Sequence, residues 1–249
     1  MRPFSYDLHV HSCLSPCGDD EATPNSIAGL ASLIGLDIVA LTDHNTSRNC
    51  PAFFRAAEAY GITPVAGMEL TTAEDVHMVC LFPTLEQALA FNDLVDANRV
   101  RIRNRPEIFG RQLIRDEEDG IIGEEPDLLI NATNLTLEEG AEKARGMGGA
   151  AFPAHIDRNS NGILAVLGMM PEKPFFPTVE FRDPEKREAL MREHHLEDRR
   201  VLVSSDAHTI TSLNEAEHFV HLDAEPGDHE AIRRELIALI NRRPEGRTL

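Results

Sequence analysis

Six histidines of this 249-residue chain lie at or next to the ends of short apolar runs that resemble β-strands, and carboxylates accompany them. A strand that ends in His, Asp or Glu delivers its side chain to the mouth of a sheet or barrel. Few sites other than multinuclear metal centres use so many imidazoles and carboxylates together. The residues are His9, His11, His44, Glu69, His77, His155, Asp206 and His208. These ligands are too many for one zinc ion and would serve two or three divalent ions.

The first of these runs places three ionisable side chains on one face of a strand. Asp7, His9 and His11 are spaced two residues apart, whereas Leu8 and Val10 point to the opposite face. An inward row of such groups is costly unless something pairs with it. A lone histidine is more often a satisfied core residue, but a row of three indicates a metal site.

Each of the other candidates has a structural alternative. Asp43 and His44 follow an apolar run, so one would bind metal and the other would orient a ligand, while Asp43 could also cap a helix. Glu69 ends a strand, and glutamate is rarely buried without a partner. Taken alone, Glu69 and His77 would be interpreted as structural residues. Asp206 is a stronger indication, because it follows a buried strand and ligands gather at the carboxyl ends of parallel strands.

The composition limits the partners that we expect. With 24 Lys and Arg against 42 Asp and Glu, the formal net charge is −18, and the chain has no Trp and two Tyr. A non-specific nucleic-acid or anionic-membrane surface needs a basic face. We therefore expect no duplex nucleic acid and no membrane as partners. No apolar run reaches membrane-spanning length, no signal peptide is recognisable, and the four cysteines lack a zinc-ribbon pattern, so we expect a cytoplasmic protein with free thiols. The oligomeric state is not specified by the sequence.

Strand-like and helix-like stretches alternate along the chain, which predicts a parallel sheet with helices outside it. The expected strands are 5–11, 37–42, 62–69, 76–82, 127–133, 149–154, 178–182 and 201–205. The expected helices are 24–34, 51–60, 84–101, 136–146, 184–195 and 228–243. Thr23 is the expected N-cap of the first helix and Gly61 the expected end of the second. The irregular segment 102–127 could lie over a barrel mouth.

In their order along the chain, these motifs resemble the polymerase-and-histidinol-phosphatase (PHP) family of metal-dependent phosphoesterases. The matching residues are Asp7-Leu8-His9-Val10-His11-Ser12, Leu41-Thr42-Asp43-His44-Asn45, Gly67-Met68-Glu69, His77, Ala154-His155 and Ser205-Asp206-Ala207-His208. Each motif is short, but the ordered set is specific and covers nearly the whole chain. The resemblance implies an α/β fold, a distorted (β/α)7 barrel of the PHP type. We expect a single PHP domain over 1–249, in which 84–148 could form a cap.

The resemblance also implies a trinuclear metal centre of Mn, Zn, Fe or Mg ions. The first ion would be bound by His9, His11, Glu69 and Asp206. Glu69 would bridge to a second ion, and the remaining positions would be completed by the other residues of the motifs and a loop carboxylate. These other residues are His44, His77, His155 and His208.

The loop that follows the first motif is longer here than in the family, where it supplies an aspartate ligand before a Thr-Pro pair. Counting back from Thr23-Pro24 selects Asp19, whereas counting by the glycine selects Cys17; Asp20 is a third candidate. We expect Asp19, because a hard oxygen suits Mn, Mg or Fe and a thiolate would require a softer ion.

The expected reaction is hydrolysis of a small phosphomonoester or nucleotide by metal-activated hydroxide. Asp206 or His208 could assist proton transfer. Arg48, Arg158 and Arg182 each follow a strand end and could contact the substrate phosphate, although each could equally form a surface salt bridge. One alternative is a metal-dependent hydrolase that acts on an amide or lactone. Another is a non-catalytic metal-binding regulator, which the intact ligand set argues against.

Overall fold

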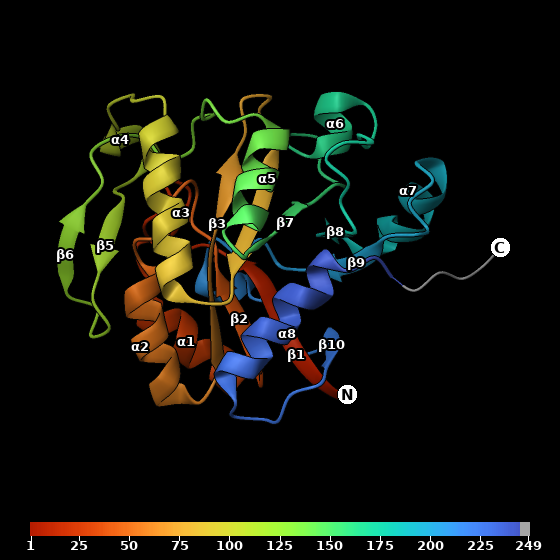
Figure 1. Cartoon of the computed structure of the whole chain (residues 1–249). Helices are drawn as coiled ribbons and strands as arrows, with labels where there is room; N and C mark the ends of the chain where they lie inside the picture. Colours follow the sequence, from red (N-terminus) through yellow and green to blue (C-terminus); the bar gives the residue numbers. More distant parts are fainter. Residues whose placement is uncertain (245–249) are drawn as a thin grey trace.

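The main sheet of the protein is curled into half a barrel (Figure 1). The computed structural model describes residues 1–244. Within that part of the chain, the sheet has six strands in the order β10-β1-β2-β3-β4-β7. These strands are β10 (Phe219–Leu222), β1 (Arg2–Val10), β2 (Ile38–Leu41), β3 (Thr63–Thr71), β4 (His77–Phe82) and β7 (Ala150–Pro153). β1, β2 and β3 are parallel, whereas β10 is antiparallel to β1 and β4 is antiparallel to both of its neighbours.

Two smaller sheets complete the described strands. The strands β8 (Thr178–Phe181) and β9 (Arg200–Val203) form a parallel pair, and β5 (Leu113–Arg115) with β6 (Ile121–Glu124) forms a hairpin. Side chains link β1 to β9: the Val203 N–H donates to Tyr6 Oη over 3.1 Å, and the Ser205 N–H donates to Asp7 Oδ1 over 3.1 Å. The predicted fold class, a distorted α/β barrel of the PHP type, is confirmed.

Helices surround the main sheet. They are α1 (Pro24–Leu33), α2 (Cys50–Tyr60), α3 (Leu85–Asn98), α4 (Pro106–Phe109), α5 (Leu137–Gly146), α6 (Ile163–Leu167), α7 (Arg187–Glu193) and α8 (His229–Asn241), with short 3₁₀ turns η1 (Pro184–Lys186) and η2 (Ile210–Ser212). The predicted cap of α1 is confirmed, because Thr23 Oγ1 accepts the Ser26 N–H over 3.1 Å. Gly61 ends α2 with a φ of 73°, in the left-handed region that glycine tolerates. In residues 1–244, no helix combines the length and apolar character needed to cross a membrane.

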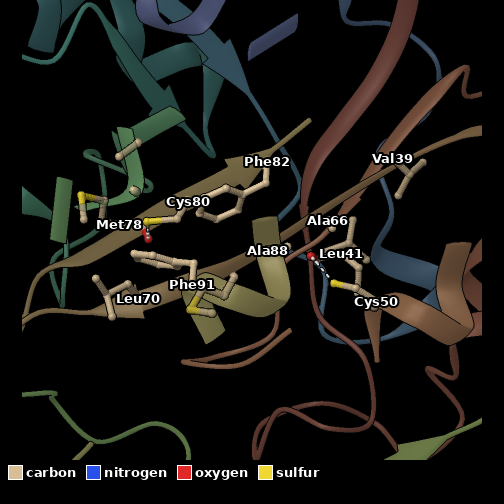
Figure 2. Packing of buried hydrophobic residues seen from close by; sticks show 14 of the residues in the cluster. Val39, Leu41, Cys50, Ala66, Leu70, Met78, Cys80, Phe82, Ala88 and Phe91 are labelled. Atoms are coloured by element: carbon tan, nitrogen blue, oxygen red, sulfur yellow. Dashed lines mark hydrogen bonds between the residues drawn. The ribbon is translucent and has the colours of Figure 1, made fainter. Parts of the chain in front are cut away.

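The outer face of the sheet packs against helices α1, α2, α3 and α5. Figure 2 shows the part of this cluster in which Cys50 of α2 and Phe91 of α3 lie among residues of β2, β3 and β4. Phe82 from β4 and Phe91 from α3 are fully buried there, with ring centroids 5.1 Å apart. Cys80 lies in the same cluster as a small apolar residue, and burial raises the pKa of its thiol. Because the helices cover the outer face of the sheet, the inner face is the one that can carry the ionisable side chains.

The inner face of the sheet carries a second apolar cluster, onto which α8 packs. Val65 on β3 and Val79 on β4 belong to this cluster. Because side chains alternate along a strand, Glu69 shares the face of Val65, and His77 shares the face of Val79. The ionisable residues therefore stand at one end of the curled sheet, above an apolar floor.

The structure differs from the sequence prediction in the direction of β4 and at 127–133, and it contains a strand, β10, that was not expected. β4 is antiparallel to β3, because only residues 72–76 join them and a parallel crossover needs about a dozen residues or more. The predicted strand 127–133 is an irregular segment with isolated bridges at its ends. There, Gln112 takes the place of a partner strand: its Nε2 donates to the Asp127 carbonyl over 2.9 Å, and its Oε1 accepts the Leu129 N–H over 2.8 Å.

The segment 102–127, which was predicted to be irregular, contains α4 and the β5–β6 hairpin. The hairpin packs against the loop that follows β1, since the Leu113 N–H donates to the Cys13 carbonyl over 3.0 Å. Asn49 at the start of α2 also donates to the Leu113 carbonyl over 3.1 Å. Within 84–148, helices α3 and α5 pack on the sheet, so only the part between them extends beside the site.

Candidate metal centre

Eight ionisable side chains converge at the end of the curled sheet where β1, β2 and β3 finish and β4 begins. They are His9, His11, His44, Glu69, His77, His155, Asp206 and His208. Glu69 is central to the group. One of its oxygens lies 2.8 Å from His77 Nδ1 and 2.9 Å from His155 Nε2, and the other lies 3.0 Å from His44 Nδ1. Four elements far apart in sequence thus deliver ligands to one carboxylate.

Asp206 approaches the same cluster from the loop after β9. Its Oδ1 lies 3.4 Å from His11 Nε2 and 3.6 Å from His9 Nε2. The Nε2 atoms of these two histidines are only 3.1 Å apart. The ring of His208 stacks on His11, with centroids 4.2 Å apart. Two inward Nε2 atoms facing two carboxylates make a compact donor set for a cation.

The ligand atoms in the described part of the chain form three overlapping groups, in each of which all atoms lie within 4.8 Å of one another. The groups are His9, His11, Glu69 and Asp206; His44, Glu69 and His77; and His11, His44 and His208. Glu69 has two oxygens and can serve two ions, whereas the one inward nitrogen of an imidazole serves one. Glu69 belongs to two of these groups, so the clustered residues fit divalent metal ions.

Buried polar atoms that lack a hydrogen-bond partner among residues 1–244 concentrate in this cluster. They include His44 Nδ1, Glu69 Oε2, His77 Nδ1, His155 Nδ1 and Asp206 Oδ1. Leaving a buried polar atom unpaired costs about 1–3 kcal/mol. Imidazole and carboxylate groups are ligands of Zn, Mn and Fe. The residues present therefore fit divalent metal ions, which would supply the missing partners.

Two neighbouring hydrogen bonds fix which nitrogen each histidine turns inward. His9 Nδ1 lies 2.8 Å from Glu180 Oε2, a carboxylate oxygen, so Nδ1 carries the proton. His11 Nδ1 lies 2.9 Å from Ser15 Oγ, whose own proton goes to Asp43 Oδ1 over 2.7 Å. Ser15 therefore accepts from His11 Nδ1. Once Nε2 has lost its proton, each ring presents an Nε2 lone pair to the cluster, as metal ligation requires.

Asp7 stands apart from the ligand groups, although strand alternation predicts that it shares a face with the two histidines of β1. A β-bulge between Asp7 and Val10 rotates the end of the strand. The Asp7 carboxylate accepts the N–H groups of Ser205 (3.1 Å) and Asn214 (3.2 Å) instead. Burial raises the pKa of Asp7 to about 6. Its position shows that it anchors the loop that carries Asp206.

Three residues at the site adopt left-handed backbone conformations that side chains with a Cβ rarely tolerate. The φ angles are 27° for His155, 52° for Asp206 and 52° for Asn45. Such conformations cost roughly 1–3 kcal/mol each and cluster at functional sites. Asn45 is held by three hydrogen bonds, among them the Thr71 N–H to its Oδ1 over 2.8 Å. The surrounding contacts hold the ligand-bearing loops in place despite the strain.

The surroundings raise the pKa of some histidines of the cluster and lower the pKa of others. Burial by itself would lower the pKa of His11, but its hydrogen bonds to Asp206 and Glu69 raise that pKa to about 9. The pKa of His9 is also raised against the effect of burial, chiefly by the charge of Glu180. Burial would raise the pKa of Glu69, but the neighbouring histidines hold it well below its usual range. Without metal, protonated imidazoles therefore compensate the buried carboxylates.

The remaining two perturbed histidines shift in the opposite direction. Burial lowers the pKa of His44 to about 3, and burial followed by the charge of His11 lowers the pKa of His208 to about 4. Both rings are neutral near pH 7. Neutral imidazole is the form that binds metal, so these two side chains accept an ion without losing a proton.

The structure does not bring Asp19 into any of the three ligand groups. Asp19 is exposed, and its Oδ1 accepts the Glu21 N–H over 2.9 Å. Its backbone N–H donates to the His208 carbonyl over 2.9 Å, so the residue borders the site through its main chain. Asp20 is exposed as well. In this conformation, the loop carboxylates shape the loop and face solvent.

Cys17, the alternative loop residue, lies near enough to the cluster for the charges of its carboxylates to change the pKa of the Cys17 thiol. Cys17 is exposed at the surface, but desolvation of its thiol raises the pKa of that thiol, and the carboxylates of Glu69 and Asp206 raise it further. The thiol is also outside the three ligand groups found in residues 1–244. A raised pKa keeps the thiol protonated, which makes it a poor ligand until a cation approaches.

The three candidate arginines have different surroundings. Arg158 donates from Nη1 to Asp206 Oδ2 over 2.8 Å, so it contacts the cluster directly. Arg182 lines a pocket together with Arg158. Arg48 forms an ion pair with the buried carboxylate of Glu125. Of the three, Arg158 is the one that the structure brings to a proposed ligand.

The PHP domain family model matches residues 7–151, which is more than half of the chain. The chain belongs to the PHP domain family. Members of this family are metal-dependent hydrolases, mostly phosphoesterases. The order of the ligand motifs in the sequence and the curled half-barrel of the structure agree with this assignment.

Two curated relatives match part of this PHP chain. An error-prone DNA polymerase from Symbiobacterium thermophilum is 38% identical over 74 residues, which are 30% of this chain and 7% of that protein. An uncharacterized protein from Methanocaldococcus jannaschii is 33% identical over 76 residues, which are 27% of this chain and 44% of that protein. The matched segments thus cover less than half of either relative.

Solved structures share the fold over nearly the whole PHP chain. A complex of endonuclease Q with a 27-mer duplex that has an abasic lesion at the active site gives a TM-score of 0.63 at 21% identity, covering 97% of this chain and 58% of that chain. A protein from Bifidobacterium adolescentis, provisionally assigned as a metal-dependent phosphoesterase, gives 0.56 at 20% identity, with coverages of 93% and 95%. An amidohydrolase from Chromobacterium violaceum with bound sulfate gives 0.54 at 18% identity, with coverages of 90% and 93%. At these identities the likeness shows the fold.

The predicted exclusion of duplex nucleic acid is wrong. Endonuclease Q has the same fold and is seen with a DNA duplex at its active site. The net charge of −18 is a sum over the whole molecule, whereas contact with a phosphate backbone depends on the local field at the mouth of the site. Arg158 and Arg182 supply positive charge there. A nucleic-acid substrate is therefore compatible with this PHP domain.

Two residues of the site were not predicted from the sequence, Glu180 and Ser15. Glu180 lies between Val179 and Phe181 of β8, both of which pack in the outer apolar cluster. A carboxylate in the middle of such a buried strand is a signal that could have revealed an inward acid. Ser15 lies in the loop after β1, where spacing gives no comparable signal.

Proposed function

We propose that this PHP-family metal-dependent hydrolase cleaves phosphoester bonds, with a small phosphomonoester or nucleotide as substrate. The observation that carries the proposal is the sharing of Glu69 between two ligand groups, one of which contains Asp206. Arg158, a phosphate-binding side chain, is bonded to Asp206. A pair of cations next to a guanidinium is suited to a phosphoryl group, which carries several negative oxygens.

The proposed ligands divide as the geometry groups them. His9, His11, Glu69 and Asp206 would hold one ion. Glu69, His44, His77 and His155 would hold a second, and His208 would contribute to a third position. When bound, two or three ions of Mn, Zn, Fe or Mg would lower the pKa of water and offset charge on the phosphoryl oxygens.

Arg158 is proposed to hold the substrate phosphate. Its Nη1 is occupied by Asp206 Oδ2, but the guanidinium has further N–H donors, and its side chain is 35% exposed. The planar fork of arginine matches two phosphoryl oxygens at once. The bond to Asp206 fixes the guanidinium at the edge of the cluster, so substrate binding requires little reorganisation there.

His208 is the proposed proton carrier, and the backbone carbonyl of Asp206 orients its ring. His208 Nδ1 lies 2.7 Å from the Asp206 carbonyl, which can only accept, so Nδ1 carries the proton and Nε2 is free. The ring is partly exposed and stacks on His11. An Nε2 that no ion occupies can take a proton from water at the mouth of the site and then pass that proton to a leaving group.

We also propose that the part of 84–148 lying between α3 and α5 acts as a cap. The β5–β6 hairpin in this part is held against the loop after β1 by the Leu113 N–H, which donates to the Cys13 carbonyl, and against the start of α2 by the Arg115 N–H, which donates to Asn49 Oδ1. That loop connects His11 to the mouth of the site. A hairpin fixed beside it would limit the size of the substrate.

Metal-loaded protein assayed on a substrate panel tests the proposed function. The panel contains p-nitrophenyl phosphate, nucleotides, single-stranded DNA, duplex DNA with an abasic site, and p-nitrophenyl acetate with a lactone for the alternative. We expect hydrolysis of phosphoesters. Asp206→Asn and His9→Gln should each reduce it at least ~100-fold, the upper end for loss of an outer-shell partner, with unchanged circular dichroism. The exposed Glu185→Gln serves as the control. Unchanged turnover in both site variants, or turnover of the ester or lactone alone, would contradict the proposal.

The alternative, hydrolysis of an amide or lactone, is supported by the structural likeness to an amidohydrolase. The contact between Arg158 and Asp206 favours the phosphoesterase, because a neutral amide or lactone has no negative oxygens for a guanidinium to bind. The same substrate panel separates the two functions.

A further inference from the structure

A pocket of about 440 Å³ opens beside the metal centre, on the surface formed by the loops after β7 and β8. It is lined by residues 157–159 and 182–184 and by Lys186. This volume lies within the range of roughly 300–1,000 Å³ that is usual for small-molecule sites. The pocket is larger than a single phosphoryl group needs, so it can hold another part of a substrate.

The pocket is connected directly to the metal centre at its Arg158 side. Arg158 lines the pocket and donates to Asp206 Oδ2 over 2.8 Å. Its backbone N–H donates to the His155 carbonyl over 2.9 Å. Arg182, which also lines the pocket, comes two residues after Glu180, which holds His9. A molecule bound at the cluster would therefore extend naturally into this pocket.

The carboxylates of the lining are already engaged by backbone donors. Asp157 is buried, and its two oxygens accept the N–H groups of Arg182 (3.0 Å) and Asp183 (2.8 Å). Asp183 in turn accepts the Glu185 N–H over 3.0 Å. These bonds shape the two loops and partly satisfy the negative charge. The groups left to meet a ligand are consequently the cationic side chains and the exposed amide of Asn159.

Three cations face the pocket, and they have few competing partners. Arg158 is bound to Asp206 through one nitrogen only. Lys186 lies 3.7 Å from Asp183 Oδ2, a loose ion pair at a half-exposed position. Within residues 1–244, no carboxylate lies within 4.0 Å of the Arg182 guanidinium nitrogens. Pro184 is the one apolar residue of the lining, so an aromatic or aliphatic group would find little to pack against.

We propose that Arg182 and Lys186 form a subsite for a second phosphate of the substrate, while the metal centre holds the phosphate that is cleaved. This inference rests on the proposed phosphoesterase function. Arginine binds phosphate through two parallel N–H bonds and lysine binds it as a point charge, so the pair suits a dianionic group. The second phosphate could belong to a small bisphosphorylated molecule or to the neighbouring nucleotide of a nucleic-acid strand. Both present the same chemistry to the pocket.

Matched substrates that differ by one phosphate test the inference. The pairs are fructose 6-phosphate with fructose 1,6-bisphosphate, and adenosine 5′-phosphate with adenosine 3′,5′-bisphosphate. A third pair, thymidine 5′-phosphate with 5′-phosphorylated oligothymidylate, represents the nucleic-acid source. For metal-loaded wild-type protein we expect kcat/KM to be at least about tenfold higher for the two-phosphate member of one pair or more, as one added charge-assisted hydrogen bond predicts.

The variant Arg182→Gln, alone and with Lys186→Gln, should reduce that preference at least about tenfold, mainly through KM. Arg192→Gln is the matched control, because it removes one exposed arginine from α7 outside the pocket. It should leave the preference unchanged. A merely structural role of Arg182 would lower both members of a pair equally.

The outcomes separate this inference from the proposed function. If no phosphoester is hydrolysed, the proposed function fails. If phosphoesters are hydrolysed but no pair shows a preference, or if Arg182→Gln and Arg192→Gln preserve the preference equally, only the second-phosphate subsite is refuted. Preference within the thymidine pair alone would identify a nucleic-acid strand as the source of the second phosphate.

Discussion

Replacing Glu180 should weaken metal binding, because this residue positions two ligands at once. Its Oε2 accepts His9 Nδ1–H over 2.8 Å and the His155 backbone N–H over 3.0 Å, whereas its Oε1 has no partner among residues 1–244. In Glu180→Gln, the amide oxygen can take the place of Oε2 and retain both bonds without the negative charge. In Glu180→Ala both bonds are lost, and the His9 ring is free to turn.

The expected magnitudes follow from these bonds. Loss of an outer-shell partner lowers metal affinity by about 10–100-fold, which corresponds to roughly 1.4–2.8 kcal/mol. A charge-assisted hydrogen bond is about twice as strong as a neutral one. Glu180→Gln should therefore lie near the tenfold end, and Glu180→Ala near the hundredfold end. In Glu180→Gln, the amide oxygen still holds the proton of His9 on Nδ1. In Glu180→Ala, no acceptor at position 180 fixes that tautomer.

Calorimetric titration of chelator-treated protein with Mn²⁺ or Zn²⁺ measures the effect. Glu185→Gln removes an exposed carboxylate from the turn η1 that follows β8 and is the matched control. Circular dichroism of each variant shows whether the fold persists. The reasoning is refuted if all three variants bind metal as tightly as the wild type, or if the Gln and Ala variants of Glu180 lose affinity equally.

Three further predictions concern protons, ions and packing. The pKa of His11 is about 9 without metal, so binding of an ion at pH 7 should displace its proton. Metal affinity should therefore rise with pH up to about 9. Calorimetric titrations in buffers of different ionisation enthalpy count the protons that are released. At a free metal concentration 100 times Kd, the ions should stabilise the folded state by about 2.7 kcal/mol. A chelator should therefore lower the Tm measured in a thermal melt. An unchanged Tm would count against metal binding to the folded state. Phe91→Ala should lower the free energy of unfolding by about 3–5 kcal/mol in urea titration, with metal affinity unchanged.

The candidate ligand residues could be predicted from the sequence because the rules that indicate them are local. A strand end and its alternation can be read from a few residues, as at Glu69 and His77. The partners that orient the ligands follow no such rule. Glu180 is 171 residues away from His9, and only the packing of β8 beside the main sheet brings them together.

Backbone irregularities account for the predictions that failed locally. The bulge in β1 separates Asp7 from the histidines, and alternation alone cannot reveal an inserted residue. In the loop after β1, counting residues selected Asp19, but the loop turns that side chain toward solvent. At 127–133, the side chain of Gln112 replaces a neighbouring strand, so apolar residues alone did not produce one.

The charge pattern implies that the centre is assembled before metal arrives. Burying Glu69 and Asp206 without compensation would be prohibitive, but protonated His9 and His11 lie within 3.6 Å of these carboxylates. A metal ion that binds there replaces protons and leaves the local charge nearly balanced. The backbone strain at His155 and Asp206 is likewise held by protein contacts, through Glu180 and Ser205. The metal-free protein should therefore stay folded and lose only the stability supplied by the ions, unlike small zinc domains that unfold without metal.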